Sequence, residues 1–135
     1  MSTTLPEQGI ETVHDHVVIQ LADRWAKAFV CKATIKTSVA HGLQADPSQL
    51  CDIVGWYVSS SGNFMEWMAE VETEESLGNP QTVDKWRKAV TRGIPFYLLV
   101  PRGMKDSSLK MADESSIVFT YVYEYSFVNT VLQIL

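Results

Sequence analysis

Three carboxylates, Asp52, Glu70 and Glu72, are the side chains of this sequence best suited to chemistry. Glu70 and Glu72 lie two residues apart in a segment with strand character, and side chains two apart on a strand share one face. Carboxylate oxygens are the ligands that a hard cation such as Mg²⁺ prefers. If Asp52 joins the two glutamates, we expect a divalent-metal site that polarises a phosphoryl oxygen and activates a bound water.

The position of Asp52 depends on how two predicted strands pair across the short polar link 60–63. A three-residue loop within this link places Asp52 opposite Glu72, so that all three acids share a face. A two-residue loop places Asp52 opposite Val71 instead, because a slip of one residue inverts a strand. We take the three-residue loop as the prediction, and Gly55 is a further position that can host a β-bulge.

These acids also have a plain structural interpretation. Acidic side chains on the exposed face of a hairpin are common, and Glu72, Glu74 and Glu75 form a charged run that leads into a loop. Against this, like charges directly opposite in a sheet are destabilising. A bound cation would give a reason for placing Asp52 against Glu72.

Hydrophobic periodicity predicts the elements that position the acids. In chain order they are a helix from Ile10 to Ala28, a strand over 29–37, hairpin strands over 50–59 and 64–73, a helix that begins at Asn79-Pro80 and ends at Gly93, a buried strand over 95–101, a short helix within 104–114 and a strand over 117–128. We predict one α/β domain over residues 1–135, with a mixed sheet of four or five strands flanked by helices.

Composition limits the function classes. The net charge of −5 argues against a broad basic surface for nucleic acid, although it leaves room for a local basic patch. No apolar run approaches the roughly 20 residues of a membrane span, and the start of the chain lacks a signal pattern, so we expect a cytoplasmic protein without a membrane partner. Cys31 and Cys51 lie in apolar runs, which favours buried free thiols over a disulfide.

The runs Cys51-Asp52-Ile53-Val54-Gly55 and Ala69-Glu70-Val71-Glu72-Thr73, in this order of elements, resemble the PD-(D/E)XK or restriction endonuclease-like superfamily. The resemblance covers roughly residues 10–101. With the run 94–101 included, the chain also resembles a group of small nuclease-like proteins of unassigned function. It implies a core in the order α-β-β-β-α-β. It also implies Mg²⁺-dependent hydrolysis of phosphodiester bonds, with DNA or RNA as the partner.

The resemblance assigns roles to individual residues. Asp52 and Glu70 match the two acids that bind Mg²⁺, whereas Glu72 stands at the position of the motif's lysine as a further ligand or a water-positioning group. Glu11, on the first predicted helix, matches an additional acid that some members use as a ligand. Cys51 replaces the proline of the motif, which is a minor departure.

The missing lysine is the serious departure, and it leaves two functions open. Lys36 on the first predicted strand or Lys85 on the second predicted helix would replace it in a nuclease, although Lys85 also fits a solvated surface position. The alternative is a nuclease-like scaffold without catalysis that acts as an interaction module. In that case the β-rich C-terminus is suited to adding a strand to a second copy in a homodimer. His14 approaches the acids if its helix packs there, and otherwise is a surface residue.

Overall fold

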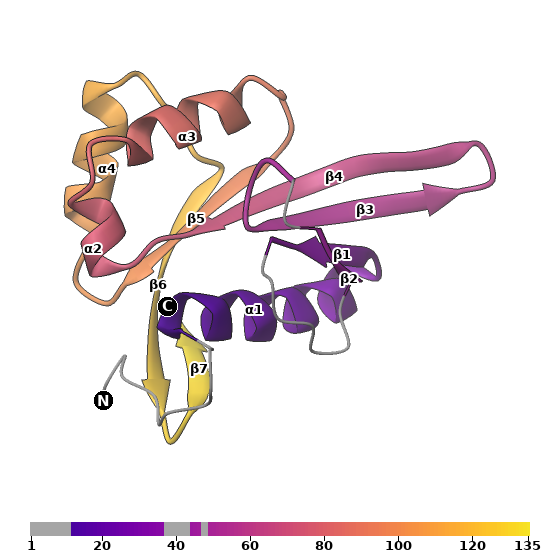
Figure 1. Ribbon diagram of the computed structural model, residues 1–135, viewed down its shortest axis with the longest axis horizontal. Helices are drawn as coiled ribbons and strands as arrows, with labels where there is room; N and C mark the ends of the chain where they lie inside the picture. Colours follow the sequence, from indigo (N-terminus) through magenta and orange to yellow (C-terminus); the bar gives the residue numbers. More distant parts are fainter. Residues whose placement is uncertain (1–11, 37–43, 47–48) are drawn as a thin grey trace.

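The computed structural model describes residues 12–36, 44–46 and 49–135 (Figure 1). Its helices and strands are α1 Val13–Phe29, β1 Lys32–Ile35, β2 Gln44–Ala45, β3 Ile53–Ser59, β4 Gly62–Val71, α2 Glu74–Leu77, α3 Thr82–Val90, β5 Phe96–Pro101, α4 Lys105–Glu114, β6 Tyr121–Val128 and β7 Val131–Ile134. The strands form one mixed sheet in the order β2-β1-β3-β4-β5-β6-β7. The α/β class with a mixed sheet and flanking helices is therefore confirmed.

The predicted number of four or five strands is wrong, because the sheet already has seven strands within the described residues. Two residues of the predicted loop, Gln44 and Ala45, pair with β1. The C-terminal segment also folds back on itself instead of forming one long strand. Asn129 and Thr130 both have positive φ angles, of 51° and 65°, and they turn the chain from β6 into the antiparallel β7.

The sheet has an antiparallel half and a parallel half. β1, β3 and β4 pair antiparallel, whereas β4, β5 and β6 run parallel. Parallel neighbours need a crossover, and α3 and α4 lie in the two connections. The β3–β4 hairpin extends well past the helices, while its open end lies in the body of the protein (Figure 1).

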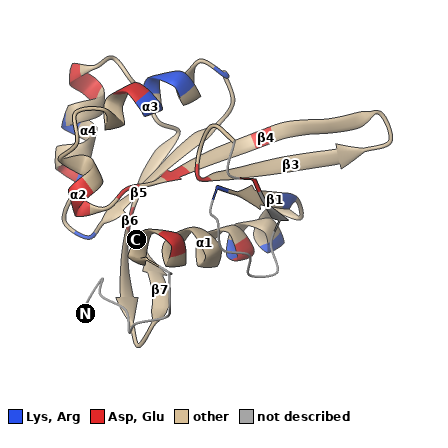
Figure 2. Ribbon diagram, viewed as in Figure 1, with Lys and Arg blue, Asp and Glu red and all other residues tan. Residues whose placement is uncertain are grey.

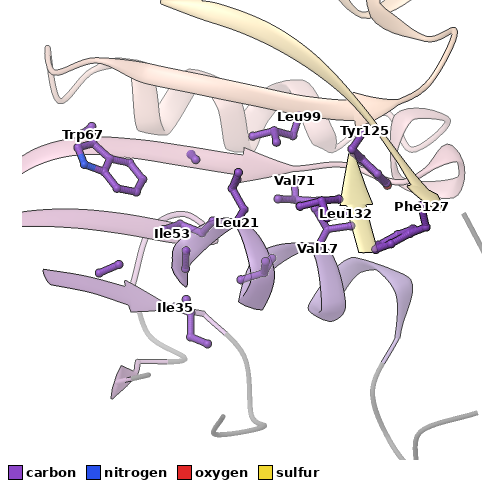
Figure 3. Packing of buried hydrophobic residues seen from close by; sticks show 14 residues of the cluster. Val17, Leu21, Ile35, Ile53, Trp67, Val71, Leu99, Tyr125, Phe127 and Leu132 are labelled. Atoms are coloured by element: carbon purple, nitrogen blue, oxygen red, sulfur yellow. The ribbon is translucent and has the colours of Figure 1, made fainter. Parts of the chain in front are cut away.

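Two hydrophobic cores lie on opposite faces of the sheet. On one face α1 buries Val17 and Leu21 against Ile53 and Leu99 (Figure 3). On the other face lies a core that includes Trp86 of α3 and residues of α4, β3, β4, β5 and β6. The open end of the β3–β4 hairpin is therefore covered by α1 on one side and by α3 on the other.

Neither of the two predicted hairpin registers is correct. Ser59 pairs with Gly62, so the turn consists of residues 60 and 61, and the pairing shifts by one residue between Gly55 and Trp56. This shift is a β-bulge, but its extra residue is Glu66 of β4, so the bulge lies opposite Gly55 and not at Gly55 as expected. Gly55 is needed there because a Cβ atom would lie 2.1 Å from Cε2 of Trp67.

Beyond the bulge Ile53 pairs with Ala69, which brings Asp52 beside Glu70 and not opposite Glu72. The new pairing differs from the predicted one by two residues. A difference of two residues keeps Asp52 on the same face of the hairpin as Glu70, because side chains alternate with a period of two.

The helix boundaries also differ from the predictions. α1 begins at Val13, where the Thr12 hydroxyl accepts a hydrogen bond from the backbone N–H of Asp15, and the predicted start at Ile10 lies outside the described residues. α1 continues to Phe29, so the strand predicted from that residue begins only at Lys32.

The second predicted helix is shorter at both ends than the predicted range from Asn79-Pro80 to Gly93. α3 begins at Thr82, and Asn79 instead stabilises a turn by accepting a hydrogen bond of 2.9 Å from the N–H of Gln81. Thr91 is the C-cap, two residues before Gly93.

Both cysteines are free, as predicted, with Cys51 buried and Cys31 partly buried. In the part of the chain that the structure describes, every helix is too short or too polar to cross a membrane.

Candidate functional site

Asp52 and Glu70 form a buried pair of acids at the open end of the β3–β4 hairpin. Only 7% of Asp52 and 3% of Glu70 are exposed. The backbone N–H of Asp52 donates to Oε1 of Glu70 (3.0 Å), and the N–H of Val71 donates to Oδ2 of Asp52 (2.8 Å). Each carboxylate thus accepts a hydrogen bond from a backbone N–H at or next to the other acid.

His14 brings a third titratable group to this pair from the first turn of α1. Its Nε2 lies 3.1 Å from Oδ2 of Asp52, and its Nδ1 lies 2.9 Å from Oδ1 of Asp15. Burial opposes protonation, but the hydrogen bonds and charges of Asp52 and Asp15 outweigh it and raise the pKa of His14 to about 9. The imidazole is therefore charged at neutral pH, with both ring nitrogens donating.

The pKa values of Asp52 and Glu70 are shifted in opposite directions. Burial raises the pKa of Glu70 well above its ordinary value, and the adjacent charge of Asp52 raises it further. Burial also acts to raise the pKa of Asp52, but hydrogen bonds from His14 and Glu70 hold it below its ordinary value. The lowered pKa of Asp52 and the raised pKa of Glu70 therefore place a proton bound by this pair on Glu70, beside an ionised Asp52.

Glu72 is even less exposed, at 1%, but its carboxylate is bound elsewhere. Oε1 accepts a hydrogen bond of 2.6 Å from the hydroxyl of Ser76, and Oε2 accepts one of 2.9 Å from Nε1 of Trp86. Burial raises the pKa of Glu72 although these hydrogen bonds and the charge of Lys85 act to lower it. The structure thus joins Glu72 to α2 and α3, while Asp52 and Glu70 bind each other.

The predicted basic residues and the helix acid have different positions. Lys85 on α3 is exposed, yet its charge acts on both Glu70 and Glu72. Lys36 is exposed at the end of β1, where its backbone N–H donates to the carbonyl oxygen of Asp52 (2.8 Å). Glu11 lies outside the described residues.

Two partners of Glu72 were not among the residues singled out from the sequence. Trp86 was predicted only as a core residue, and Ser76 was not considered. Ser76 belongs to a capping box with Thr73 at the start of α2. The spacing Thr73-x-x-Ser76 was the available signal, whereas the contact with Trp86 joins residues 14 apart in the chain and has no local signature.

A cleft of about 540 Å³ lies next to these groups. Its lining includes His14, which contacts Asp52, and Tyr125, whose hydroxyl donates to the backbone oxygen of Glu72 (2.8 Å). Thr73, Glu74 and Glu75 line the cleft from the segment that follows β4. The cleft gives the buried acids a neighbouring space large enough for a small ligand.

Within the described residues, no group of three or more His, Cys, Asp and Glu side chains is arranged to hold a metal ion. The predicted three-carboxylate arrangement therefore reduces to one carboxyl pair with a separately bound Glu72. Comparisons with protein-family models, with curated proteins and with solved structures find no match to this chain.

Proposed function

We propose that this protein is a metal-dependent phosphodiesterase of the PD-(D/E)XK type, with Asp52 and Glu70 as its metal-binding acids. The observation that carries the proposal is the pairing of two buried acids, in which the backbone N–H of Asp52 donates to the carboxylate of Glu70, next to a cleft that His14 lines. Burying two such groups is costly unless they are paired or bind a cation. A structural role does not explain why two acids occupy a position that one acid and one amide would fill.

The order of elements supports the same proposal. α1, β1, β3, β4, α3 and β5 follow one another as a helix, three antiparallel strands, a helix and a parallel strand. This is the order that the resemblance implies once the two-residue β2 and the single-turn α2 are set aside. Asp52 lies directly before β3, and Glu70 lies near the end of β4.

The donor set fits a hard divalent cation with two protein ligands. Mg²⁺ is commonly bound by one or two carboxylates together with water and substrate phosphates, and Asp52 and Glu70 supply two. When bound, the cation would polarise a phosphoryl oxygen and lower the pKa of a water. We assign Glu72 a supporting role and not that of a third ligand, because its two oxygens accept hydrogen bonds from Ser76 and Trp86.

The chain's own residues then have distinct roles. His14 anchors Asp52 and carries a positive charge to the cleft, where a phosphate would lie. Glu72, held between Ser76 and Trp86, fixes the end of β4 against α2 and α3.

The same bonds of Glu72 favour a second function, which is a nuclease-like scaffold without catalysis. At the position of the motif's lysine the chain has Glu72, whose carboxylate accepts structural hydrogen bonds from Ser76 and Trp86. In this alternative the Asp52–Glu70–His14 network is also purely structural, and the fold serves as an interaction module.

Cleavage assays separate the two functions. Single- and double-stranded DNA and RNA are incubated with the protein in Mg²⁺, in Mn²⁺ and in EDTA. We expect cleavage that requires the metal, that is lost in Asp52→Asn and Glu70→Gln, and that persists in the control Glu114→Gln, which changes an exposed acid of α4. Absence of metal-dependent cleavage, or equal cleavage by all four proteins, would support the scaffold instead.

A further inference from the structure

The exposed side of α3 carries a dense group of cations on an otherwise acidic protein. Lys85, Arg87 and Lys88 are exposed on the helix, and Arg92 is exposed just after it, whereas Asp84 is the one acid of this segment. Figure 2 shows basic residues along α3 and acidic residues on α2 and α4. The protein therefore has a local basic surface although its net charge is −5.

Three of these cations, Arg87, Lys88 and Arg92, line a groove of about 700 Å³ together with Leu50. Asp84 also lines it and forms a 3.1 Å ion pair with Arg87. A guanidinium has five N–H donors, so this single bond leaves Arg87 able to bind a further anion.

Helix capping accounts for only part of this charge. Arg87 and Lys88 lie in the last turn of α3, where cations complement the helix dipole. Lys85 lies in the first half of the helix, where the dipole does not favour a cation, whereas Arg92 lies just past the C-cap, at the negative end of the dipole. The groove cations Arg87, Lys88 and Arg92 extend over more than one helical turn and present a positive surface to an anionic partner.

Two segments that contribute to the groove also contribute to the surroundings of the carboxyl pair. Trp86, between Lys85 and Arg87 in sequence, turns inward and donates to Glu72, and the charge of Lys85 acts on Glu70 and Glu72. Leu50, which also lines the groove, precedes Asp52 by two residues. The groove and the carboxyl pair are therefore built from neighbouring segments of the chain.

We infer that the groove formed by Leu50, Arg87, Lys88 and Arg92 binds the sugar–phosphate backbone of a nucleic acid and directs it toward the Asp52–Glu70 pair. This inference rests on the proposed function and adds the surface that holds the substrate. Cations spaced along a groove match the regular charges of a phosphate backbone and give sequence-independent, salt-dependent binding. An acidic protein is the competing partner class.

The test compares two triple variants with the same change in net charge. Arg87→Gln/Lys88→Gln/Arg92→Gln removes the groove cations, and Lys27→Gln/Lys32→Gln/Lys110→Gln removes three exposed cations from other elements. Binding of fluorescent single- and double-stranded oligonucleotides is measured by anisotropy in EDTA over a series of salt concentrations. EDTA keeps the measurement independent of metal binding and cleavage.

We expect the groove variant to bind at least about tenfold more weakly and its salt slope to fall by about three, one for each lost phosphate contact. The control variant should retain the affinity and slope of the starting protein. Equal weakening in both variants, or no salt-dependent binding by the starting protein, would overturn the inference. So would competition by poly-glutamate as effective as that by an oligonucleotide of equal charge, since it would point to an acidic protein.

Calorimetry with Mn²⁺ on the same variants keeps the two proposals apart. The groove variant should bind Mn²⁺ as the starting protein does. Oligonucleotide binding without Mn²⁺ binding would leave the groove in place and refute the metal site, whereas the reverse would refute the groove alone.

Discussion

At the scale of single residues, the Asp52–Glu70–His14 network is the feature that distinguishes this protein from an ordinary α/β domain. His14 of α1 contacts Asp52, which precedes β3, and Asp52 in turn contacts Glu70 of β4; both acids are buried and His14 is partly buried. His14 pairs with an ionised Asp52, and the pKa of Glu70 is raised well above that of Asp52. Because the groups depend on one another, each substitution has its own pH dependence.

Glu70→Gln should stabilise the metal-free protein at neutral pH. The pKa of Glu70 is raised in the folded state, so its contribution is fully present below the ordinary value of 4.5 and is lost as the pH rises through the folded pKa. The Gln amide keeps both hydrogen bonds of the protonated acid and never ionises. Thermal unfolding in EDTA should give similar melting temperatures near pH 4 and a higher one for the variant near pH 8. The exposed control Glu66→Gln should change neither, and a variant less stable than the starting protein at pH 8 would contradict the protonated state of Glu70.

His14→Gln should show the opposite trend with pH. The folded pKa of His14 is about 9 against an ordinary value of 6.5, so its stabilisation is complete below pH 6.5 and is lost as the pH rises through 9. Each pKa unit corresponds to about 1.4 kcal/mol, so the variant should lose on the order of 3 kcal/mol of unfolding free energy near pH 6. Urea titrations at several pH values measure this loss. A loss that stays constant from pH 6 to pH 10 would mean that the His14–Asp52 ion pair contributes nothing.

At the scale of elements, α3 and α1 each perform one task that their hydrophobic periodicity does not indicate. α3 fixes the end of β4 through the bond from Trp86 to Glu72. α1 covers the open edge of the sheet, because Gln20 and Arg24 bond the backbone of β7. Both tasks depend on polar atoms within or beside an apolar stripe.

Trp86→Phe should destabilise the protein more than Trp56→Phe. Loss of the Trp86 indole N–H leaves a buried carboxylate with one partner fewer, at a cost of about 2 kcal/mol. Trp56 is only partly buried, and its indole donates to the neutral hydroxyl of Thr34, so its loss should cost about 1 kcal/mol or less. Chemical denaturation of both variants gives the comparison. Equal losses would show that the bond to Glu72 has no special weight.

Gln20→Ala/Arg24→Ala should promote self-association. The N–H of Leu132 donates to Oε1 of Gln20 (3.0 Å), and the carbonyl oxygen of Leu132 accepts from Nη2 of Arg24 (2.6 Å). These bonds occupy backbone groups on the outer edge of β7, and a free sheet edge is a template for another strand. Sedimentation velocity should detect dimers or larger species of the double variant. The control Lys27→Ala, on the same helix, should sediment as the starting protein does, and a monomeric double variant would refute the protective role.

At the scale of the whole molecule, the sequence was sufficient for the layers but not for the contacts between them. Periodicity located the main helices and strands, since burial imposes a period of 3.6 on a helix and of 2 on a strand. The pairing of Asp52 was mispredicted because the turn lies at residues 60 and 61, which shifts the residue opposite Asp52 by three, and the bulge shifts it back by one, to Glu70. The bonds of His14 with Asp52 and of Trp86 with Glu72 join segments that are distant in sequence, so no local sequence pattern predicts them.

The most direct test of the proposed function is calorimetric titration of Mn²⁺ near pH 6 in two buffers with different enthalpies of ionisation. The difference between the buffers gives the number of protons released on binding. If a cation takes the place of the proton between Asp52 and Glu70, binding should release about one proton, since ligands must lose their protons to a metal. Binding should disappear in Glu70→Gln and persist in Glu72→Gln. Absence of binding by the starting protein, or binding that Glu70→Gln leaves unchanged, would contradict the metal site and with it the proposed phosphodiesterase.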